Sequence, residues 1–361
     1  MSRPRIAIRA DVSAEIGTGH VRRCLSLAVA LRELGAAPVF VTRDLDVDIR
    51  HVVGSTDFEI LTLPPPQVPF SPSAEDPAHA AWAALPWEVD AEETAAALAG
   101  VDVKALVVDT YSFDSRWHTR MRDSIGAPLV AIDDLGDRPL AAELIVDHNL
   151  HSGHRRKHAV SSGLYGRLLG GPNYALIANY YADAPRYAFA PRVSSIGIFM
   201  GGSDAANAST LALDAVDCAD LDVDLELVST SANPFLDRLS KRAAQNPRLA
   251  LSVDLPNLAA FFARHDLQIG AGGGASWERC CIGPPTLGIV AAENQKQVLR
   301  PLHALGAVAI VDDEGADALA IARELVSLAE DVERRRELSR RARLLVDGGG
   351  ARRVAREVMS L

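Results

Sequence analysis

Short apolar runs and helix-spaced apolar residues alternate along the whole chain. The first run, Ile6 to Arg9, predicts a buried strand, and the polar turn after it tightens through Gly17 and Gly19. A helix then opens at or near His20 and ends before Gly35, a typical helix stop. Its apolar positions recur three and four residues apart: Val21, Cys24, Leu25, Ala28, Leu31 and Leu34.

The same alternation continues through the first half of the chain. Apolar runs predict strands, and helical spacing predicts helices between them. Residues 64–77 are rich in proline and are expected to form a surface loop. We expect strands at 38–42, 59–63, 104–108, 129–132 and 143–146, and helices at 90–98 and 113–124.

Three of these strands stop on acidic residues: Asp109, the pair Asp133 and Asp134, and Asp147. In a parallel sheet the carboxyl ends of the strands share one edge, so these carboxylates are expected to lie at that edge. Each aspartate could equally cap the helix that follows it, which is a common use of this residue.

A second series of strands and helices begins at Ser195, after a stretch at 179–192 with two prolines and no apolar period. We expect strands at 195–200, 225–228, 249–253, 267–269, 286–290 and 308–311. The pattern predicts an N-terminal domain at 1–180, a linker at 181–192 and a C-terminal domain at 193–361, whose last helix could pack back on the first domain. The predicted fold class is α/β, with two doubly wound domains facing each other across a cleft.

Composition narrows the class of protein. The chain has 361 residues, 48% hydrophobic and 23% charged, as in a soluble globular protein. A net charge of -10 argues against a nucleic-acid surface, although helix N-termini can still hold a phosphate. Neither a signal peptide nor a run of membrane-spanning length is expected, and the four cysteines are interpreted as buried, reduced thiols of a cytoplasmic protein.

His20 stands where the first strand leads into the first helix, and two interpretations compete. It could be a helix-start residue bonded to a neighbouring carbonyl. Alternatively, it could be a catalytic base, because doubly wound folds bind ligands outside the carboxyl ends of their strands. The helix N-terminus also favours the neutral ring, which can accept a proton. The glycine pair Gly17 and Gly19 would let a ligand approach the backbone closely.

Two glycine clusters in the second half follow predicted strands and precede predicted helices: Gly201-Gly202-Ser203 and Gly272-Gly273-Gly274-Ala275-Ser276. Backbone N–H groups at a helix start, together with a hydroxyl, suit a phosphate. Either cluster could be only a tight turn, but two of them in one domain favour a diphosphate ligand. Glu278 follows closely and could accept hydrogen bonds from a ribose, or simply stabilise the helix dipole.

Two Asp-x-Asp segments, at 46–48 and 222–224, have the form of a metal-binding pair. Asp222 and Asp224 begin an alternating strand, so their side chains are expected to face solvent. We therefore predict no metal and no cofactor, and assign stabilisation of a leaving phosphate to helix N-termini.

With these motifs assembled, the chain resembles a known family over nearly its whole length. It is similar to the hydrolases of pseudaminic acid biosynthesis that remove UDP from a diacetamido-trideoxy sugar, and to their spore-coat polysaccharide relatives. The family resembles the GT-B glycosyltransferases that build peptidoglycan. The matching stretches are R-A-D-V-S-A-E-I-G-T-G-H-V-R-R-C, V-V-D-T-Y, I-D-D-L-G-D-R-P, L-L-G-G-P-N-Y-A-L-I, M-G-G-S-D-A-A-N, G-A-G-G-G-A-S-W-E-R-C-C-I-G-P-P and A-E-N-Q.

The resemblance implies a role for each motif. The family's catalytic histidine falls on His20, and Tyr111 and Asn294 are implied to face the reacting sugar. The nucleotide contacts would fall on the second-half glycine clusters, namely Gly201, Gly202, Ser203, Gly274, Ala275, Ser276 and Glu278. Water would attack the anomeric carbon with inversion and release UDP, with His20 orienting or deprotonating that water. Asp11 is a further candidate for water activation.

Two positions depart from the family pattern: Thr110 replaces a histidine, and Ala178 replaces an arginine. Both are expected on the sugar side of the cleft, so the exact sugar is left open. The prediction is a metal-independent, cytoplasmic nucleotide-sugar hydrolase, a monomer or weak dimer without nucleic-acid or membrane partners. An inverting GT-B glycosyltransferase is the alternative, and a non-enzymatic nucleotide-sugar binding module is a third possibility.

Overall fold

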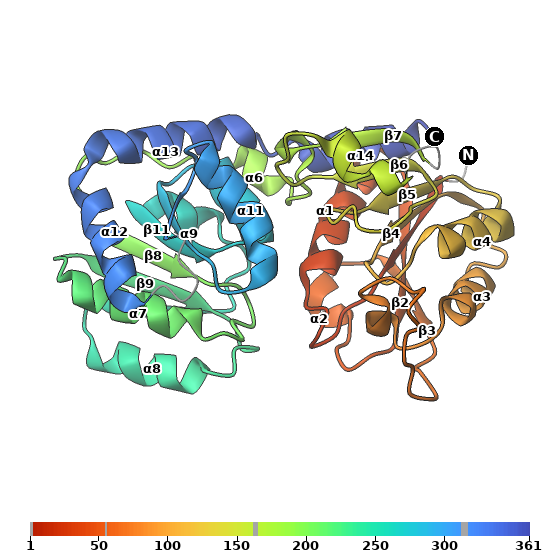
Figure 1. Cartoon of the computed structure of the whole chain (residues 1–361), viewed down its shortest axis with the longest axis horizontal. Coiled ribbons are helices and arrows are strands. Elements are labelled where there is room, and N and C mark those ends of the chain that lie inside the picture. Colours follow the sequence, from red (N-terminus) through yellow and green to blue (C-terminus); the bar gives the residue numbers. More distant parts are fainter. Residues whose placement is uncertain (1–2, 55, 162–164, 312–316) are drawn as a thin grey trace. The chain divides into compact units, whose positions relative to one another are not determined.

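The computed structural model describes residues 3–54, 56–161, 165–311 and 317–361, apart from the side chain of Asn294. The chain divides into two compact units. Residues 1–179 and 349–361 form the first unit, and residues 180–348 form the second. Each unit is built on one parallel sheet flanked by helices (Figure 1).

The first unit contains a seven-stranded sheet in the order β3-β2-β1-β4-β5-β6-β7. Its described strand pairs all run parallel. The strands are β1 (Arg5–Ala10), β2 (Ala37–Arg43), β3 (Glu59–Leu63), β4 (Val103–Asp109), β5 (Leu129–Ile132), β6 (Ala142–Asp147) and β7 (Tyr165–Gly170). The helices are α1 (Gly19–Glu33), α2 (Arg50–Val53), α3 (Trp87–Ala97), α4 (Ser115–Ile125), α5 (His154–Lys157) and α14 (Gly350–Met359), with short 3-10 turns η1 (Ala80–Ala83), η2 (Ala159–Ser161) and η3 (Pro172–Tyr174).

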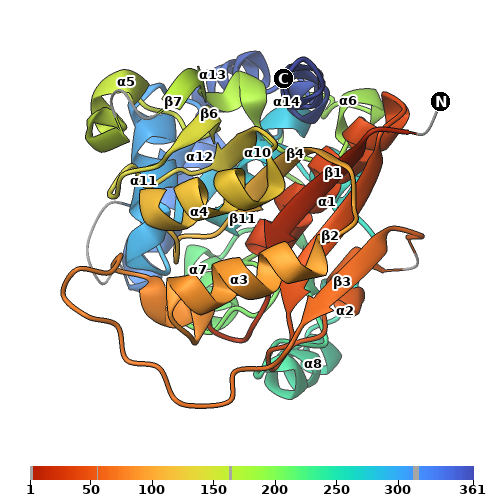
Figure 2. The same ribbon diagram turned by 90° about the vertical axis from the view of Figure 1, so that its right-hand side faces the viewer.

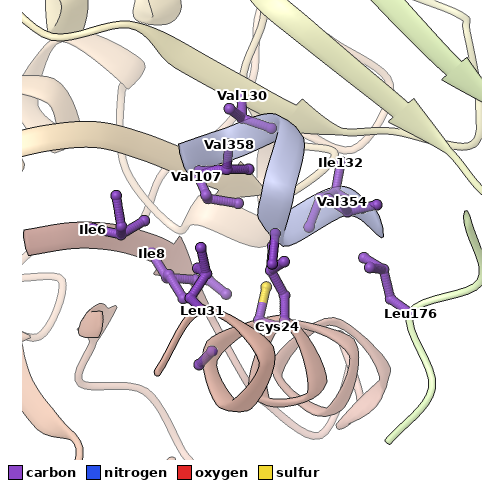
Figure 3. Packing of buried hydrophobic residues seen from close by; sticks show 14 of the residues in the cluster. Ile6, Ile8, Cys24, Leu31, Val107, Val130, Ile132, Leu176, Val354 and Val358 are labelled. Carbon is purple, nitrogen blue, oxygen red and sulfur yellow. The ribbon is translucent and has the colours of Figure 1, made fainter. Parts of the chain in front are cut away.

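Both faces of this sheet are buried, which explains why its strands read as continuous apolar runs. On one face Ile6 and Ile8 of β1 and Val107 of β4 pack against Cys24 and Leu31 of α1 (Figure 3). The opposite face packs against α3 and α4, which lie side by side over it (Figure 2). The sheet is therefore the rigid centre from which the strand-end residues project.

The last helix, α14, belongs to the first unit although the whole second unit precedes it in sequence. Val354 and Val358 are fully buried in the same core cluster as α1 (Figure 3). Burial of each such side chain contributes about 1.5–3 kcal/mol. Gly350 lies so close to the backbone of Ala175 that no side chain would fit there. The C-terminal helix is thus part of the core that supports α1.

The second unit contains a six-stranded parallel sheet in the order β10-β9-β8-β11-β12-β13. The strands are β8 (Ser195–Phe199), β9 (Asp224–Ser229), β10 (Leu249–Val253), β11 (Leu267–Ala271), β12 (Thr286–Ile289) and β13 (Ala309–Ile310). The helices are α6 (Tyr180–Asp183), α7 (Ala208–Ala219), α8 (Leu236–Gln245), α9 (Ala259–Arg264), α10 (Gly274–Ile282), α11 (Glu293–Ala304), α12 (Ala318–Glu330) and α13 (Val332–Leu345). Its central strand β8 lies between β9 and β11, as β1 lies between β2 and β4.

The two doubly wound sheets confirm the predicted fold class, and every predicted strand has a counterpart. The edge strand β7 was missed, because its sequence Y-G-R-L-L-G contains two glycines and no continuous apolar run. Residues 181–192, expected as a linker, bury Tyr181 and Tyr187 in the second unit. The thiol prediction was wrong in one case: Cys24, Cys280 and Cys281 are buried, but Cys218 is exposed. Among the described helices, none is long and apolar enough to cross a membrane.

Candidate functional site

The strand order of each sheet reverses beside its first strand. In the first unit β1 leads to α1 and its neighbour β4 leads to α4, so the chain turns to opposite sides at this point. Such a switch point leaves open space at the carboxyl ends of the two strands, where doubly wound folds bind ligands. His20 lies at the start of α1, and Asp109 is the last residue of β4, paired in register with Ala10.

His20 and Asp109 form a buried hydrogen-bonded pair. The distance from His20 Nδ1 to Asp109 Oδ1 is 2.6 Å, and the exposed fraction of His20 is 8%. An ionised carboxylate can only accept, so Nδ1 carries the proton and donates it. The other ring nitrogen, Nε2, then holds the lone pair and can act as a base. This is the arrangement by which an aspartate fixes the tautomer of a catalytic histidine.

Arg23, one turn further along α1, keeps Asp109 ionised. Its Nε donates to Oδ2 and its Nη2 to Oδ1, both at 2.6 Å. Cys24 Sγ lies 3.4 Å from the same Oδ2. Burial alone would raise the pKa of Asp109, but Arg23 and His20 offset it and hold this pKa well below its usual range. Asp109 is therefore a permanent negative charge behind the imidazole.

A second acid extends the network. Asp134, which follows β5, accepts hydrogen bonds from the Tyr111 hydroxyl and from Asn149 Nδ2, the latter at 3.0 Å. Arg23 Nη1 lies 3.4 Å from Asp134 and so links it to Asp109. Burial and the charge of Asp134 raise the pKa of Tyr111 well above its ordinary value. The tyrosine is thus a neutral donor, and its ring packs edge-on against His20 with centroids 4.6 Å apart.

Two further aromatic side chains reach this point from the segment between β3 and α3. Trp82, in η1, packs edge-on toward His20 with ring centroids 6.4 Å apart. His79 lies 4.6 Å from Trp82 and 5.7 Å from Tyr111, measured between ring centroids. We call His79, Trp82 and Tyr111 the aromatic cluster. His79 and Trp82 were not predicted from the sequence, since nothing in or beside a proline-rich loop signals that the chain returns to a strand end.

The other candidates of the first unit occupy different surroundings. Asp11 accepts hydrogen bonds from Arg9 Nη1 at 2.5 Å and from the Arg43 backbone N–H at 2.7 Å, and among the described residues it makes no hydrogen bond with His20. Gly17 has a φ of 73° and closes the turn before α1, which begins at Gly19. Arginine partners therefore surround Asp11, whereas His20 and Tyr111 lie together.

The two positions that depart from the family pattern belong to the first unit as well. The Thr110 hydroxyl accepts the Ser112 backbone N–H at 3.2 Å and so serves the turn before α4. Ala178 is half-buried after η3.

In the second unit, the first glycine cluster does not lead directly into a helix as expected. Gly201 has a φ of 101°, and α7 begins only at Ala208. Asp204 caps this helix, accepting the N–H groups of Ala208 and Ser209 at 2.8 and 3.0 Å. The first N–H groups of α7 are thus already occupied by a carboxylate, which competes with any anion. Gly201, Gly202 and Ser203 remain a predicted nucleotide contact.

The second cluster leads directly into α10. Gly273 has a φ of 120°, the helix begins at Gly274, and no side chain caps its first turn among the described residues. Nothing lies within 4 Å of the space where Gly273 or Gly274 would carry a Cβ. The helix start is therefore open and its N–H groups favour an anion. Ser276, however, turns its hydroxyl inward to the Ala271 carbonyl, at 3.4 Å.

Arg279 adds a buried cation beneath this helix start. Its Nη2 donates to the Ala271 carbonyl at 2.6 Å and to Ser276 Oγ at 3.2 Å. Its Nε and Nη1 have no hydrogen-bond partner among the described residues. Burial lowers the pKa of Arg279 to about 10, so it stays charged at neutral pH. Glu278, on the same helix, lies beside Tyr181. Burial raises the pKa of Tyr181, and the negative charge of Glu278 raises it further.

Asn294 is in α11, but its side chain lies outside the described residues. Of the Asp-x-Asp pairs, Asp48 accepts the Arg50 N–H, and Asp222 pairs with Arg248. In the part of the chain that the structure describes, no group of three or more His, Cys, Asp or Glu residues is placed to hold a metal ion.

The structure is similar to many solved GT-B proteins. It matches MurG of Acinetobacter baumannii with a TM-score of 0.68 at 12% identity, over 99% of this chain and 100% of that one. It matches a UDP-glucosyltransferase of Polygonum tinctorium capable of glucosylating indoxyl with a TM-score of 0.67 at 14% identity, over 99% of each chain. The fold is therefore that of the GT-B glycosyltransferases.

Sequence comparison also finds distant relatives, and no family model matches the chain. The chain is 24% identical to the spore coat polysaccharide biosynthesis protein SpsG of Bacillus subtilis over 253 residues, which is 64% of this chain and 73% of that protein. It is 19% identical to the uncharacterized protein MJ1062 of Methanocaldococcus jannaschii over 81% of this chain, but spans only 57% of that protein.

Proposed function

We propose that this protein is an enzyme that transfers a glycosyl group from a nucleotide sugar to a hydroxyl oxygen, with inversion at the anomeric carbon. The observation that carries the proposal is the His20–Asp109 pair at the switch point of the first unit. A buried carboxylate that fixes the proton on Nδ1 leaves Nε2 as the base, which the deprotonation of an alcohol requires.

The bond changes follow from that assignment. Nε2 of His20 takes the proton of the acceptor hydroxyl while the oxygen of that hydroxyl attacks the anomeric carbon. The anomeric C–O bond to the diphosphate breaks, and its electron pair leaves with the phosphate oxygen. Asp109 stabilises the imidazolium that forms, and Arg23 keeps Asp109 ionised. General-base assistance of this kind is worth about 10²–10⁴ in rate.

We assign the nucleoside diphosphate to the second unit. The uncapped start of α10 and the buried Arg279 beneath it both favour the charge that develops on the leaving phosphate. Glu278 would accept hydrogen bonds from the ribose. The first unit thus provides the base, and the second unit binds the nucleotide.

The comparisons favour transfer over hydrolysis. One GT-B neighbour, the spinosyn rhamnosyltransferase SpnG, is described as complexed with thymidine diphosphate, and it matches 99% of this chain with a TM-score of 0.59 at 17% identity. The sequence relative SpsG is assigned to spore coat polysaccharide biosynthesis. Hydrolysis of the donor, implied by the resemblance to the pseudaminic acid hydrolases, uses the same base with water in place of the alcohol. It is the second candidate.

Incubation with nucleotide sugars, with and without acceptor alcohols, tests this proposal. The assay measures free nucleoside diphosphate and identifies sugar products by mass spectrometry and by NMR of the anomeric proton. We expect release of diphosphate that an acceptor accelerates, and a product of inverted configuration. Release at an equal rate without acceptor, with only free sugar formed, would assign hydrolysis instead. No release from any donor would refute both.

A further inference from the structure

The aromatic cluster is held in place by contacts from several elements. Trp82 Nε1 donates to Glu15 Oε1 at 3.0 Å, and Glu15 belongs to the turn before α1. The Ser112 hydroxyl donates to the His79 carbonyl at 3.1 Å. Arg116 on α4 donates to Asp76 at 3.0 Å, and Asp76 in turn accepts the Ser73 backbone N–H at 2.8 Å. The segment at 64–86 is thus anchored at the indole N–H of Trp82, at the backbone carbonyl of His79 and at the carboxylate of Asp76.

The backbone around Trp82 is strained. Ala84, which ends η1, has a φ of 62° and lies in the left-handed region that disfavours residues with a Cβ. Such a conformation costs on the order of 1 kcal/mol. Ala80 and Ala83 are buried, so the turn is packed on its inner side. Residues in such sparsely populated backbone regions cluster at active sites and ligand-binding sites.

His79, Trp82 and Tyr111 are each half-buried. Core aromatic residues, such as Trp117 and Phe113 in the same unit, are instead fully enclosed. Trp82 and Tyr111 lie with ring centroids 5.8 Å apart at 37°, and both flank His20. Partly exposed aromatic side chains therefore lie beside the base. Aromatic faces of this kind bind rings that carry an apolar face of their own.

We propose that His79 and Trp82, with Tyr111, form the acceptor subsite, and that the acceptor is a hydroxylated six-membered ring. This inference rests on the proposed function for the chemistry of His20. A sugar ring and a phenol share the chemistry that the cluster recognises: an apolar face to stack on the indole, and a hydroxyl at the edge to reach Nε2.

The test compares Trp82→Ala and Trp82→Phe with Val68→Ala, a control in the same loop whose side chain is 70% exposed. Steady-state kinetics are measured separately for donor and for two acceptor series, methyl glycosides and simple phenols. We expect Trp82→Ala to raise the acceptor KM by about tenfold and to change the donor KM less than about twofold, because stacking is lost only on the acceptor side. Trp82→Phe should lie between wild type and Trp82→Ala.

A second measurement does not depend on turnover. The indole N–H resonances of the four tryptophans are followed by NMR, and Trp82→Phe assigns one of them. Titration with the methyl glycosides and phenols should shift the Trp82 resonance, and whichever series shifts it identifies the acceptor class. If no nucleotide sugar were consumed but the shift persisted, the proposed function would fail, and the aromatic cluster would stand only as a binding site for such rings. An unshifted resonance with an unchanged acceptor KM, or a change confined to the donor KM, would overturn the subsite.

Discussion

At the scale of single residues, the proposed chemistry depends on the contacts that Asp109 makes with His20 and Arg23. Asp109 receives His20 Nδ1 and two nitrogens of Arg23, each at 2.6 Å. An unpaired buried carboxylate would take up a proton, but the arginine prevents this and holds the pKa of Asp109 low. The orientation of the imidazole is thus fixed before any ligand binds.

A buried histidine away from the site predicts how stability responds to acid. His118 on α4 is 2% exposed, and its Nδ1 accepts the Ala141 backbone N–H at 3.2 Å. Burial, with Arg138 and Arg122 nearby, lowers the pKa of His118 to about 3 from its ordinary 6.5. Between these two pH values the unfolded chain binds a proton that the folded chain does not. Stability should therefore fall as the pH drops below 6.5.

We expect the free energy of unfolding of His118→Asn to fall less at acid pH, because asparagine keeps a hydrogen-bond acceptor but cannot titrate. The measurement is the free energy of unfolding in urea at pH 7.5, 6.0 and 5.0. His51→Asn on α2, an exposed histidine, serves as the control and should follow wild type. Equal pH slopes for wild type and His118→Asn would show that His118 is not the group responsible.

At the scale of elements, the sequence predicted most of the scaffold and part of the site. Continuous apolar runs identified β1, β4 and β5 because both faces of the sheet are covered, and the strand-end acids Asp109 and Asp134 fell at the edge expected of them. The pairing of Asp109 with Arg23 and with His20 could not be predicted, because these partners lie 86 and 89 residues apart in sequence and leave no local pattern.

Trp82 was missed for a related reason. Its position depends on anchors at Glu15 and Ser112, which the chain brings together only after folding. The start of α7 shows a different limit. A glycine-rich turn after a strand looks like an anion site, but the φ of 42° at Asp204 lets that carboxylate fold back onto the helix N-terminus.

The start of α10 provides a test of nucleotide binding by an element. Gly274 is exposed, is helical and has open space at its Cβ position, so substitution there is tolerated sterically. We expect Gly274→Asp to raise the Kd for UDP by about tenfold or more, since its carboxylate competes with phosphate for the same N–H groups. Gly274→Ala is the matched control and should bind UDP like wild type.

Isothermal calorimetry gives both affinities, and thermal unfolding shows whether the variants fold. An aspartate in the first turn stabilises a helix, so weaker binding by Gly274→Asp would not reflect unfolding. Equal UDP affinity in the two variants would place the diphosphate elsewhere in the second unit.

At the scale of the whole molecule, we propose that two units of the same winding carry different halves of the chemistry. In the first unit, β1 and β4 flank the switch point and present His20 and Asp109. In the second, β8 and β11 hold the equivalent places and present the two glycine clusters. The return of α14 to the first unit ties both chain ends to the core that supports α1. Loss of the base should therefore leave nucleotide binding intact.

The most direct test of this account measures kcat and UDP affinity for His20→Asn, with His51→Asn as the control, using whichever nucleotide sugar the wild type consumes fastest. Asparagine keeps a polar side chain but lacks a basic nitrogen. We expect a kcat lower by about two orders of magnitude or more, with UDP affinity and thermal stability like wild type. A variant that folds and keeps most of its turnover would contradict the assignment of His20 as the base.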